Sequence, residues 1–198
     1  MGFAAKQNKV YICIHMKIVV ANSKGGSGKS TLVLALADLL PSAQVIDLDP
    51  QGTITVGAAY TKRHAPVSEE EVTGEYIIYD TPPYHGEELR SYFDMADLVL
   101  IPVKVSYPDL LAAKAVIDDL RAVKMADKGV IVFNEVRKPH NNTYLEVRGL
   151  FYSNYKDIRK SGTELSNLVG FNRILSEPIH GQAKAEILSL VKELNIAL

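Results

Sequence analysis

Residues 22–31 read NSKGGSGKST, and this stretch decides the fold class. It lies between a β-branched run, KIVVA at 17–21, and a helix-forming run, STLVLALADLL at 30–40. A glycine-rich turn between a strand and a helix points several backbone N–H groups at one position and adds the positive end of the helix dipole, so it binds phosphate oxygens. The ending GKS at 28–30 matches the second half of the mononucleotide P-loop pattern, G-x-x-x-x-G-K-[ST].

The turn therefore predicts a nucleotide site. Lys29 would neutralise charge on the β- and γ-phosphates, and the Ser30 hydroxyl would bind Mg²⁺. We expect the nucleotide to contact Lys24, Gly25, Gly26, Ser27, Gly28, Lys29, Ser30 and Thr31.

The loop departs from the usual P-loop in one respect. Ser23 stands where the pattern places its first glycine, and a second lysine, Lys24, follows it. Phosphoryl transfer depends on positioning and positive charge, so a second lysine has a use. From the outer edge of the loop, Lys24 would point away from its own γ-phosphate and toward a neighbouring subunit. The alternative is an exposed loop lysine without that role.

Further apolar runs predict strands separated by helices. The runs are QVIDLD (44–49), EYIIY (75–79), LVLIPV (98–103) and GVIVFN (129–134). Helical patterns occupy 109–124, 142–158 and 184–194, and a solvated loop with a short helix is expected at 53–73. This alternation implies right-handed crossovers and a parallel sheet. The expected class is α/β: a P-loop NTPase with a mostly parallel, twisted sheet and helices on both faces.

Composition bounds the function classes. The chain has 198 residues, 47% of them hydrophobic, a formal net charge of −1 and a single cysteine. The length fits one globular domain, and the charge gives no basic field over the whole protein. Cys13 alone excludes an internal disulfide or a zinc knuckle, and no run of eighteen apolar residues predicts a membrane span. We expect a cytoplasmic protein.

A second methionine, Met16, stands just before the first predicted strand. We expect residues 1–15 to be an N-terminal extension, either upstream of the natural start or added in cloning, and residues 16–198 to form a single ATPase domain. The alternative is an additional β-strand at 10–14.

Acidic residues end two of the predicted strands. Asp80 follows an apolar strand, as a Walker B carboxylate that holds Mg²⁺ would. Asp47 and Asp49 are two residues apart, so in a strand they would project to the same side. One of them could reach the attacking water, and a structural acid is an equally good interpretation of Asp47.

Four segments together resemble the ParA/MinD ATPases. They are SKGGSGKST, similar to the deviant Walker A box, VIDLDPQG (45–52), IIYDTPP (77–83) and LVLIPVKVSYPDL (98–110). The resemblance covers about residues 16–134, and the DPQG ending favours the ParA branch.

The resemblance implies an ATP-dependent sandwich dimer. In it Lys24 would cross to the partner's phosphates, and Lys29 and Ser30 would serve phosphate and Mg²⁺. Asp49 would position the attacking water and Asp80 would support the metal. Asn134 would contact adenine, although a simple strand-end asparagine is an equal alternative.

A compact chain of this kind resembles small ParA proteins, which bind nucleoid DNA without sequence preference in the ATP-bound state. A ParB-type or other cargo adaptor would stimulate hydrolysis, and the cargo could be a plasmid, a chromosome origin or a protein body such as a carboxysome. Between 136 and 173, seven Lys or Arg stand against three acids, giving +4. The candidate DNA contacts are Arg137, Lys138, Arg148, Arg159, Lys160 and Arg173. An ordinary solvated face is the alternative, and the family pattern is hard to align after Asn134.

Two other functions stay open. A MinD-like membrane positioner would end in a basic amphipathic helix, whereas KAEILSLVKELNIAL carries two Lys and two Glu. A P-loop metabolic enzyme resembling dethiobiotin synthetase would need a substrate pocket and no DNA binding. Lys24 and the DPQG segment argue against it.

Overall fold

The computed structural model of the protein describes residues 15–83 and 86–198. The expected extension at 1–15 therefore lies, except for its last residue, outside the described residues, as does the alternative strand at 10–14. No helix in the described part of the chain is long and apolar enough to cross a membrane.

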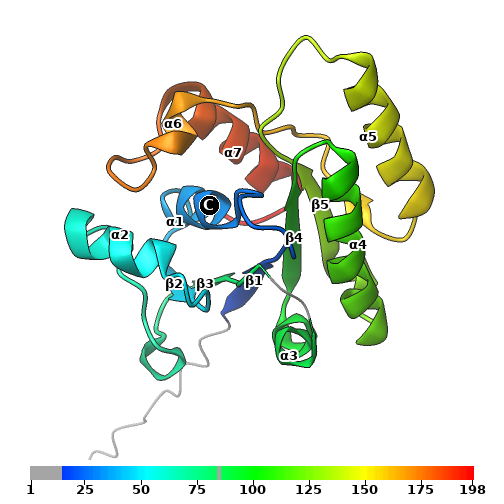
Figure 1. Cartoon of the computed structure of the whole chain (residues 1–198). Coiled ribbons are helices and arrows are strands. Elements are labelled where there is room, and N and C mark those ends of the chain that lie inside the picture. Colours follow the sequence, from blue (N-terminus) through cyan, green and yellow to red (C-terminus); the bar gives the residue numbers. More distant parts are fainter. Residues whose placement is uncertain (1–14, 84–85) are drawn as a thin grey trace, which may run out of the picture.

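A parallel sheet of six strands forms the centre of the molecule (Figure 1). The strands are β1 (Met16–Val20), β2 (Ala43–Asp47), β3 (Tyr76–Asp80), β4 (Leu98–Val103), β5 (Gly129–Phe133) and β6 (Arg159–Lys160). Their order is β2-β3-β1-β4-β5-β6, and every pair is parallel. The predicted fold class is confirmed.

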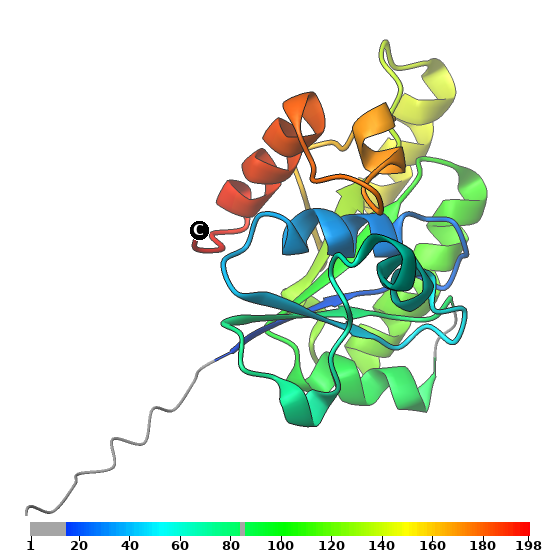
Figure 2. The ribbon, with the colours of Figure 1, turned by 90° about the vertical axis from the view of Figure 1, so that its left-hand side faces the viewer.

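Helices cover both faces of the sheet (Figures 1 and 2). They are α1 (Lys29–Ala37), α2 (Thr53–Thr61), α3 (Glu87–Met95), α4 (Tyr107–Ala122), α5 (Asn142–Asn154), α6 (Val169–Asn172) and α7 (Gly181–Glu193). Two 3-10 helices, η1 (Glu69–Glu71) and η2 (Ala126–Lys128), lie in the connections. Helices α1, α6 and α7 share a buried cluster on one face, and α3, α4 and α5 share a cluster on the other.

The alternation of side chains in β1 explains the two clusters. Ile18 and Val20 pack with α1 and α7, whereas Val19 packs with the opposite helices. All three are fully buried. A strand that is covered on both faces has a continuous apolar sequence, and for this reason the run at 17–21 predicts a strand.

The short helix expected within 53–73 is α2, which buries Ile54 and Ala58 and has its first turn hydrogen-bonded to the Asp47 carboxylate. Two strands differ from the prediction. The short strand β6 was not predicted at all, because two residues, Arg159 and Lys160, carry no apolar pattern. The predicted strand at 44–49 ends earlier, at Asp47.

The strand order fixes where the P-loop lies. The connection after β1 leads across the sheet to β2, whereas the connection after β4 leads to β5 on the other side. Ligands bind in open α/β sheets at the carboxyl ends of strands where the direction of winding reverses. The segment between β1 and α1 occupies this position.

Candidate nucleotide-binding site

Gly28 shapes the end of the P-loop, immediately before the first residue of α1. Its φ is +94°, in the region that disfavours side chains, and a Cβ there would lie 2.1 Å from Nδ2 of Asn134. Only glycine meets both conditions. The predicted strand, loop and helix arrangement is therefore present, and the loop is closed against the end of β5.

Asn134 follows β5 and holds the loop. Its Nδ2 donates a hydrogen bond to the carbonyl of Ser27 at 2.9 Å, and its Oδ1 accepts from the N–H of Glu135 at 2.9 Å. The residue is 8% exposed. Both halves of this amide are engaged within the protein, so Asn134 positions the P-loop, a role that sequence reasoning did not foresee.

Lys29 begins α1 and is buried. Burial lowers the pKa of its ammonium, and the carboxylates of Asp80 and Asp49 oppose that shift. Its Nζ lies 3.4 Å from the carbonyl of Lys24, so the side chain lies under the loop. A buried cation at the N-terminus of a helix attracts phosphate strongly, because little solvent screens it.

Asp80 ends β3 and is fully buried; its carboxylate oxygens make no hydrogen bond of full geometry in the described part of the chain, although the Ser30 hydroxyl lies close enough to interact with them. Burial raises its pKa to about 7. Asp47 and Asp49 add to that shift, whereas Ser30 and Lys29 oppose it. Buried polar atoms normally have full partners, so these two oxygens are suited to bind a cation.

The donor set fits Mg²⁺. A carboxylate and a hydroxyl, from Asp80 and Ser30, are hard oxygen ligands, and Mg²⁺ typically takes only a few protein ligands, with phosphate oxygens and water completing its shell. Among the described residues no group of three or more His, Cys, Asp or Glu could hold a metal by itself.

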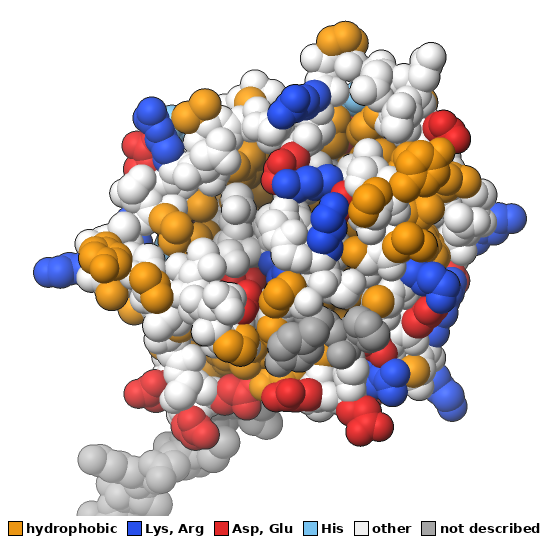
Figure 3. Space-filling view, in the orientation of Figure 1, with side chains coloured by type: hydrophobic (Ala, Val, Ile, Leu, Met, Phe, Trp, Pro, Cys, Tyr) orange, Lys and Arg blue, Asp and Glu red, His pale blue; other side chains and the backbone are white. Residues whose placement is uncertain are grey.

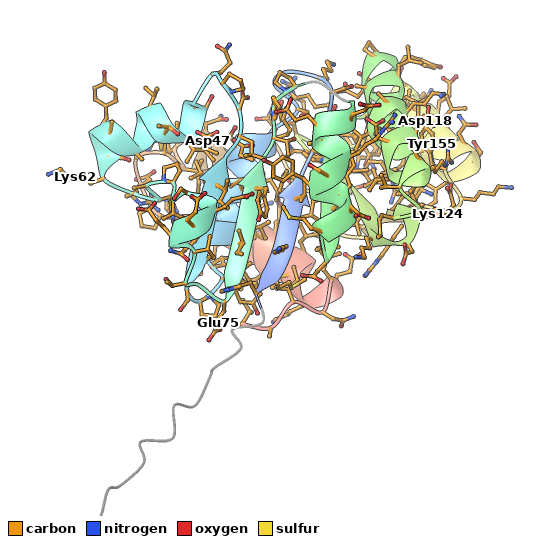
Figure 4. The ribbon with its side chains drawn as sticks, turned by 90° about the horizontal axis from the view of Figure 1, so that it is seen from below. Asp47, Lys62, Glu75, Asp118, Lys124 and Tyr155 are labelled. Carbon is orange, nitrogen blue, oxygen red and sulfur yellow. The ribbon has the colours of Figure 1, made fainter. Side chains whose placement is uncertain are left out.

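Asp47 and Asp49 have different surroundings. The Asp47 carboxylate accepts hydrogen bonds from the backbone N–H and Oγ1 of Thr55, at 2.9 and 2.7 Å, so it caps α2. Figure 4 shows Asp47 near the start of this helix and Lys62 at its far end. Asp49 lies beyond β2, and its Oδ1 accepts from the N–H of Gln51 at 2.9 Å. Because β2 ends at Asp47, the period-two argument does not apply to the pair, although both carboxylates lie near enough to Asp80 to raise its pKa.

Lys24 lies on the outer edge of the loop, with 38% of its side chain exposed. Its Nζ is 2.9 Å from Oδ2 of Asp109 in the same chain. In the single chain, the Lys24 side chain therefore points to Asp109 of its own subunit, and it does not have the expected orientation toward a neighbouring subunit. Asp109 was missed because 85 residues separate it from Lys24; the only signal was the helix-capping pattern Ser-x-x-Asp that starts at Ser106.

The structure brings three of the six candidate DNA contacts together. Lys138 and Arg148 both lie near Glu164, and Arg148 and Lys160 both lie over the Tyr152 ring. Arg137 and Lys138 follow the carboxyl end of β5, whereas Arg159 and Lys160 form β6 and pair with its amino-terminal half. On the face shown in Figure 3, the Lys and Arg side chains are scattered between other residues.

Several of these cations also have protein partners. Lys138 and Arg148 lie 3.8 and 3.6 Å from Glu164, a carboxylate that is 9% exposed. Arg173 lies 3.7 Å from Glu177. Arg159 donates to a backbone carbonyl at 2.5 Å and Lys160 to another. The charge of +4 is therefore partly paired within the fold.

Residues 18–162 match the family model described as the CobQ/CobB/MinD/ParA nucleotide binding domain. A comparison with curated proteins gives no match.

Solved structures resemble the whole fold. The ATP complex of a McdA variant from Cyanothece is 13% identical, with a TM-score of 0.71, and covers 93% of this chain and 98% of its own. The MinD cell division protein of Aquifex aeolicus is 18% identical, with a TM-score of 0.66 and coverage of 92% and 98%. The pNOB8 ParA bound to nonspecific DNA is 13% identical, with a TM-score of 0.57 and coverage of 93% and 100%. At these identities the likeness shows the fold alone.

Proposed function

Because the chain belongs to the CobQ/CobB/MinD/ParA family of nucleotide-binding domains, we propose that it is a Mg²⁺-dependent ATPase of the ParA type that dimerises around ATP. The predicted family is confirmed by the same match. One observation carries the proposal of a dimer around ATP: a second lysine, Lys24, lies on the outer edge of the P-loop, where its side chain is partly exposed and can meet a second subunit. The DPQG ending of the segment at 45–52 favours the ParA type.

In this proposal the P-loop binds the triphosphate. The backbone N–H groups between Lys24 and Ser30 and the start of α1 face the phosphates, and Lys29 neutralises the β- and γ-phosphate charge. Asn134 keeps the loop in place through its bond to Ser27. The adenine lies beside Asn134, in a cavity lined by residues that include Gly28, Thr31, Asn134, Ser166, Leu168 and Phe171.

Ser30 and Asp80 would hold Mg²⁺ together with the nucleotide. The ion, when bound, neutralises charge that develops on the phosphates. Asp49 positions the attacking water, while Asp47 shapes the same loop by capping α2. Lys24 of one subunit would stabilise negative charge in the site of the other, as positive groups do in phosphoryl transfer.

The proposed biological role is partition or positioning of cargo. The ATP-bound dimer would bind DNA without sequence preference, release it after hydrolysis, and depend on a ParB-type or other adaptor. The nucleoid of the cytoplasm would be its place of action. Arg137, Lys138, Arg148, Arg159, Lys160 and Arg173 remain the candidate contacts, and the structural likeness to a ParA bound to nonspecific DNA supports testing them.

A membrane positioner is the second candidate, because the fold is also that of a MinD. The packing of helix α7 argues against a membrane-binding role for this helix. Its apolar residues Ile187, Leu190 and Val191 are fully buried in the core and cannot also enter a bilayer. A metabolic enzyme of the CobQ or CobB kind would bind nucleotide without binding DNA.

The test is binding of the purified protein to random-sequence duplex DNA with ATP, with ADP and without nucleotide, at two salt concentrations. We expect binding with ATP only, and weaker binding at high salt, because lysine and arginine side chains that neutralise phosphates release counterions from DNA. Binding in none of the three states would refute the DNA role; vesicle binding and substrate screens would then separate the other candidates.

A further inference from the structure

The ammonium of Lys24 is held by a buried carboxylate of its own chain. Lys24 Nζ lies 2.9 Å from Asp109 Oδ2, and the Asp109 side chain is only 1% exposed. Ion pairs between exposed side chains contribute little because water screens them. Here one partner is buried, so the position of Lys24 is restrained much more strongly.

The start of α4 explains why a carboxylate is buried there. Ser106 caps the helix, its hydroxyl donates to Asp109 Oδ2, and the Asp109 N–H lies 3.4 Å from the same hydroxyl. An acid is favoured in the first turn of a helix by the helix dipole. The other carboxylate oxygen, Oδ1, has no hydrogen-bond partner in the described part of the chain. The Lys24 ammonium, on Oδ2, is therefore the cation that balances the charge of the Asp109 carboxylate.

A second contact fixes the loop to the same helix. The Ser23 hydroxyl donates to the carbonyl of Ala112 at 2.9 Å, one turn after Asp109. The residues on both sides of the peptide bond between Ser23 and Lys24 are thus seated on α4. Lys24 cannot extend toward another subunit until it leaves Asp109.

We propose that Asp109 is a positioning residue that keeps Lys24 on its own subunit in the nucleotide-free protein, and that this ion pair must break before the ATP-bound dimer forms. The proposal rests on the proposed function. Removing the cation leaves a buried, unpaired carboxylate, which is strongly unfavourable. The ion pair therefore opposes dimerisation and sets how much protein and ATP are needed for it.

The first experiment measures the contact itself in nucleotide-free protein. The rate at which an acylating reagent modifies the Lys24 amine is measured by mass spectrometry in the wild type, in Asp109→Asn and in Asp118→Asn. Asparagine has the shape of aspartate and can still accept the Ser106 hydrogen bond. Asp118 is the matched control, since it lies on the same helix but pairs with the exposed Lys114.

We expect Asp109→Asn to speed modification of Lys24 by on the order of tenfold, because an amine leaving a buried ion pair becomes available. Asp118→Asn should raise the modification rate of Lys114 and leave that of Lys24 unchanged. An unchanged Lys24 rate in Asp109→Asn, with ADP affinity and thermal unfolding like those of the wild type, would overturn the proposal.

The second experiment measures the monomer–dimer midpoint by sedimentation with a non-hydrolysable ATP analogue. We expect Asp109→Asn to dimerise at a protein concentration lower by on the order of tenfold, since no charged carboxylate is left unpaired. A midpoint equal to or above that of the wild type would overturn the proposal. If the wild type and the variant both stay monomeric, the proposed function fails, and the Lys24 modification rate still decides whether Asp109 holds this lysine.

Discussion

At the scale of single residues, the proposed function gives Lys29 and Lys24 different roles: Lys29 binds ATP, and Lys24 acts in hydrolysis by the dimer. Lys29→Ala should weaken ATP binding by about 2 kcal/mol, roughly thirtyfold, because a buried charge-assisted contact to phosphate is lost. Lys24→Ala should bind ATP almost as the wild type does while losing dimer-dependent hydrolysis. Titration with a fluorescent ATP analogue measures the affinity of both variants, and a phosphate-release assay measures hydrolysis. An equal loss of affinity in the two variants would contradict the different roles of the two lysines.

Gly28 gives a second prediction at this scale. Gly28→Ala should destabilise the loop by about 1–2 kcal/mol through its positive φ, and further by pushing the Asn134 amide away from Ser27. In an Asn134→Ala background the second part should vanish. Thermal unfolding and ATP affinity of the four proteins test this, and purely additive effects would show that the contact between Gly28 and Asn134 is unimportant.

The motif residues could be predicted from the sequence because they are contiguous. The contacts of Lys24 with Asp109 and of Asn134 with Ser27 could not, since 85 and 107 residues separate the partners. Only the fold brings them together. For Asp47, where a structural acid was an equal alternative, the contact with Thr55 in the first turn of α2 favours that structural interpretation.

At the scale of elements, Asp38 ties α1 to the end of α2 and to the segment before α7. Its carboxylate accepts hydrogen bonds from Arg63 and His64, both at 2.5 Å, and from the N–H of Ile179 at 2.7 Å. Burial alone would raise the pKa of Asp38, but the bonds from His64, Ile179 and Arg63 outweigh it and hold the pKa below its usual value. The three elements are thus joined by one charged group.

The contribution of Asp38 to the stability of the fold should depend on pH. A carboxyl whose pKa is lower in the folded state stabilises the fold above the pKa of the unfolded chain, near 3.8, and loses this effect as pH falls through the folded value. Asp38→Asn should therefore cost about 2 kcal/mol at pH 7, with the difference from the wild type shrinking below pH ~4. Urea unfolding at several pH values measures it. Asp157→Asn, at an exposed pair, should change stability by less than ~0.5 kcal/mol, and an equal loss there would contradict the assignment.

Elements with a strong apolar pattern could be predicted from the sequence. Strands β1, β3, β4 and β5 are buried on both faces and read as apolar runs. Helix α2 buries only Ile54 and Ala58, so its pattern is too weak to fix its length. Strand β6 is specified by pairing with β5 alone.

At the scale of the whole molecule, charge counted along the sequence differs from charge arranged in space. The +4 of residues 136–173 predicted one basic patch; the fold brings Lys138, Arg148 and Lys160 around Glu164 and the Tyr152 ring, and Glu164 offsets part of their charge. Hydrophobic side chains gather instead over α4 and α5 on the right of Figure 3. Exposed Tyr107, Leu111, Leu145 and Tyr152 belong to these two helices.

In the proposed dimer, each active site needs a lysine from the other subunit. A mixture of Lys24→Ala with Asp49→Ala, in which ATP hydrolysis is followed, tests this requirement. Each variant alone should be inactive. In a mixed dimer, the site that keeps Asp49 receives Lys24 from its partner, whereas the other site lacks both groups.

Equal mixing makes half of the dimers mixed and leaves one complete site in each, so we expect about a quarter of the wild-type rate. Diluting the mixture should abolish this activity together with the dimer. If Lys24 acts within its own subunit, no site in the mixture is complete. A mixture as inactive as its components, in which sedimentation shows that ATP-bound dimers have formed, would contradict the account.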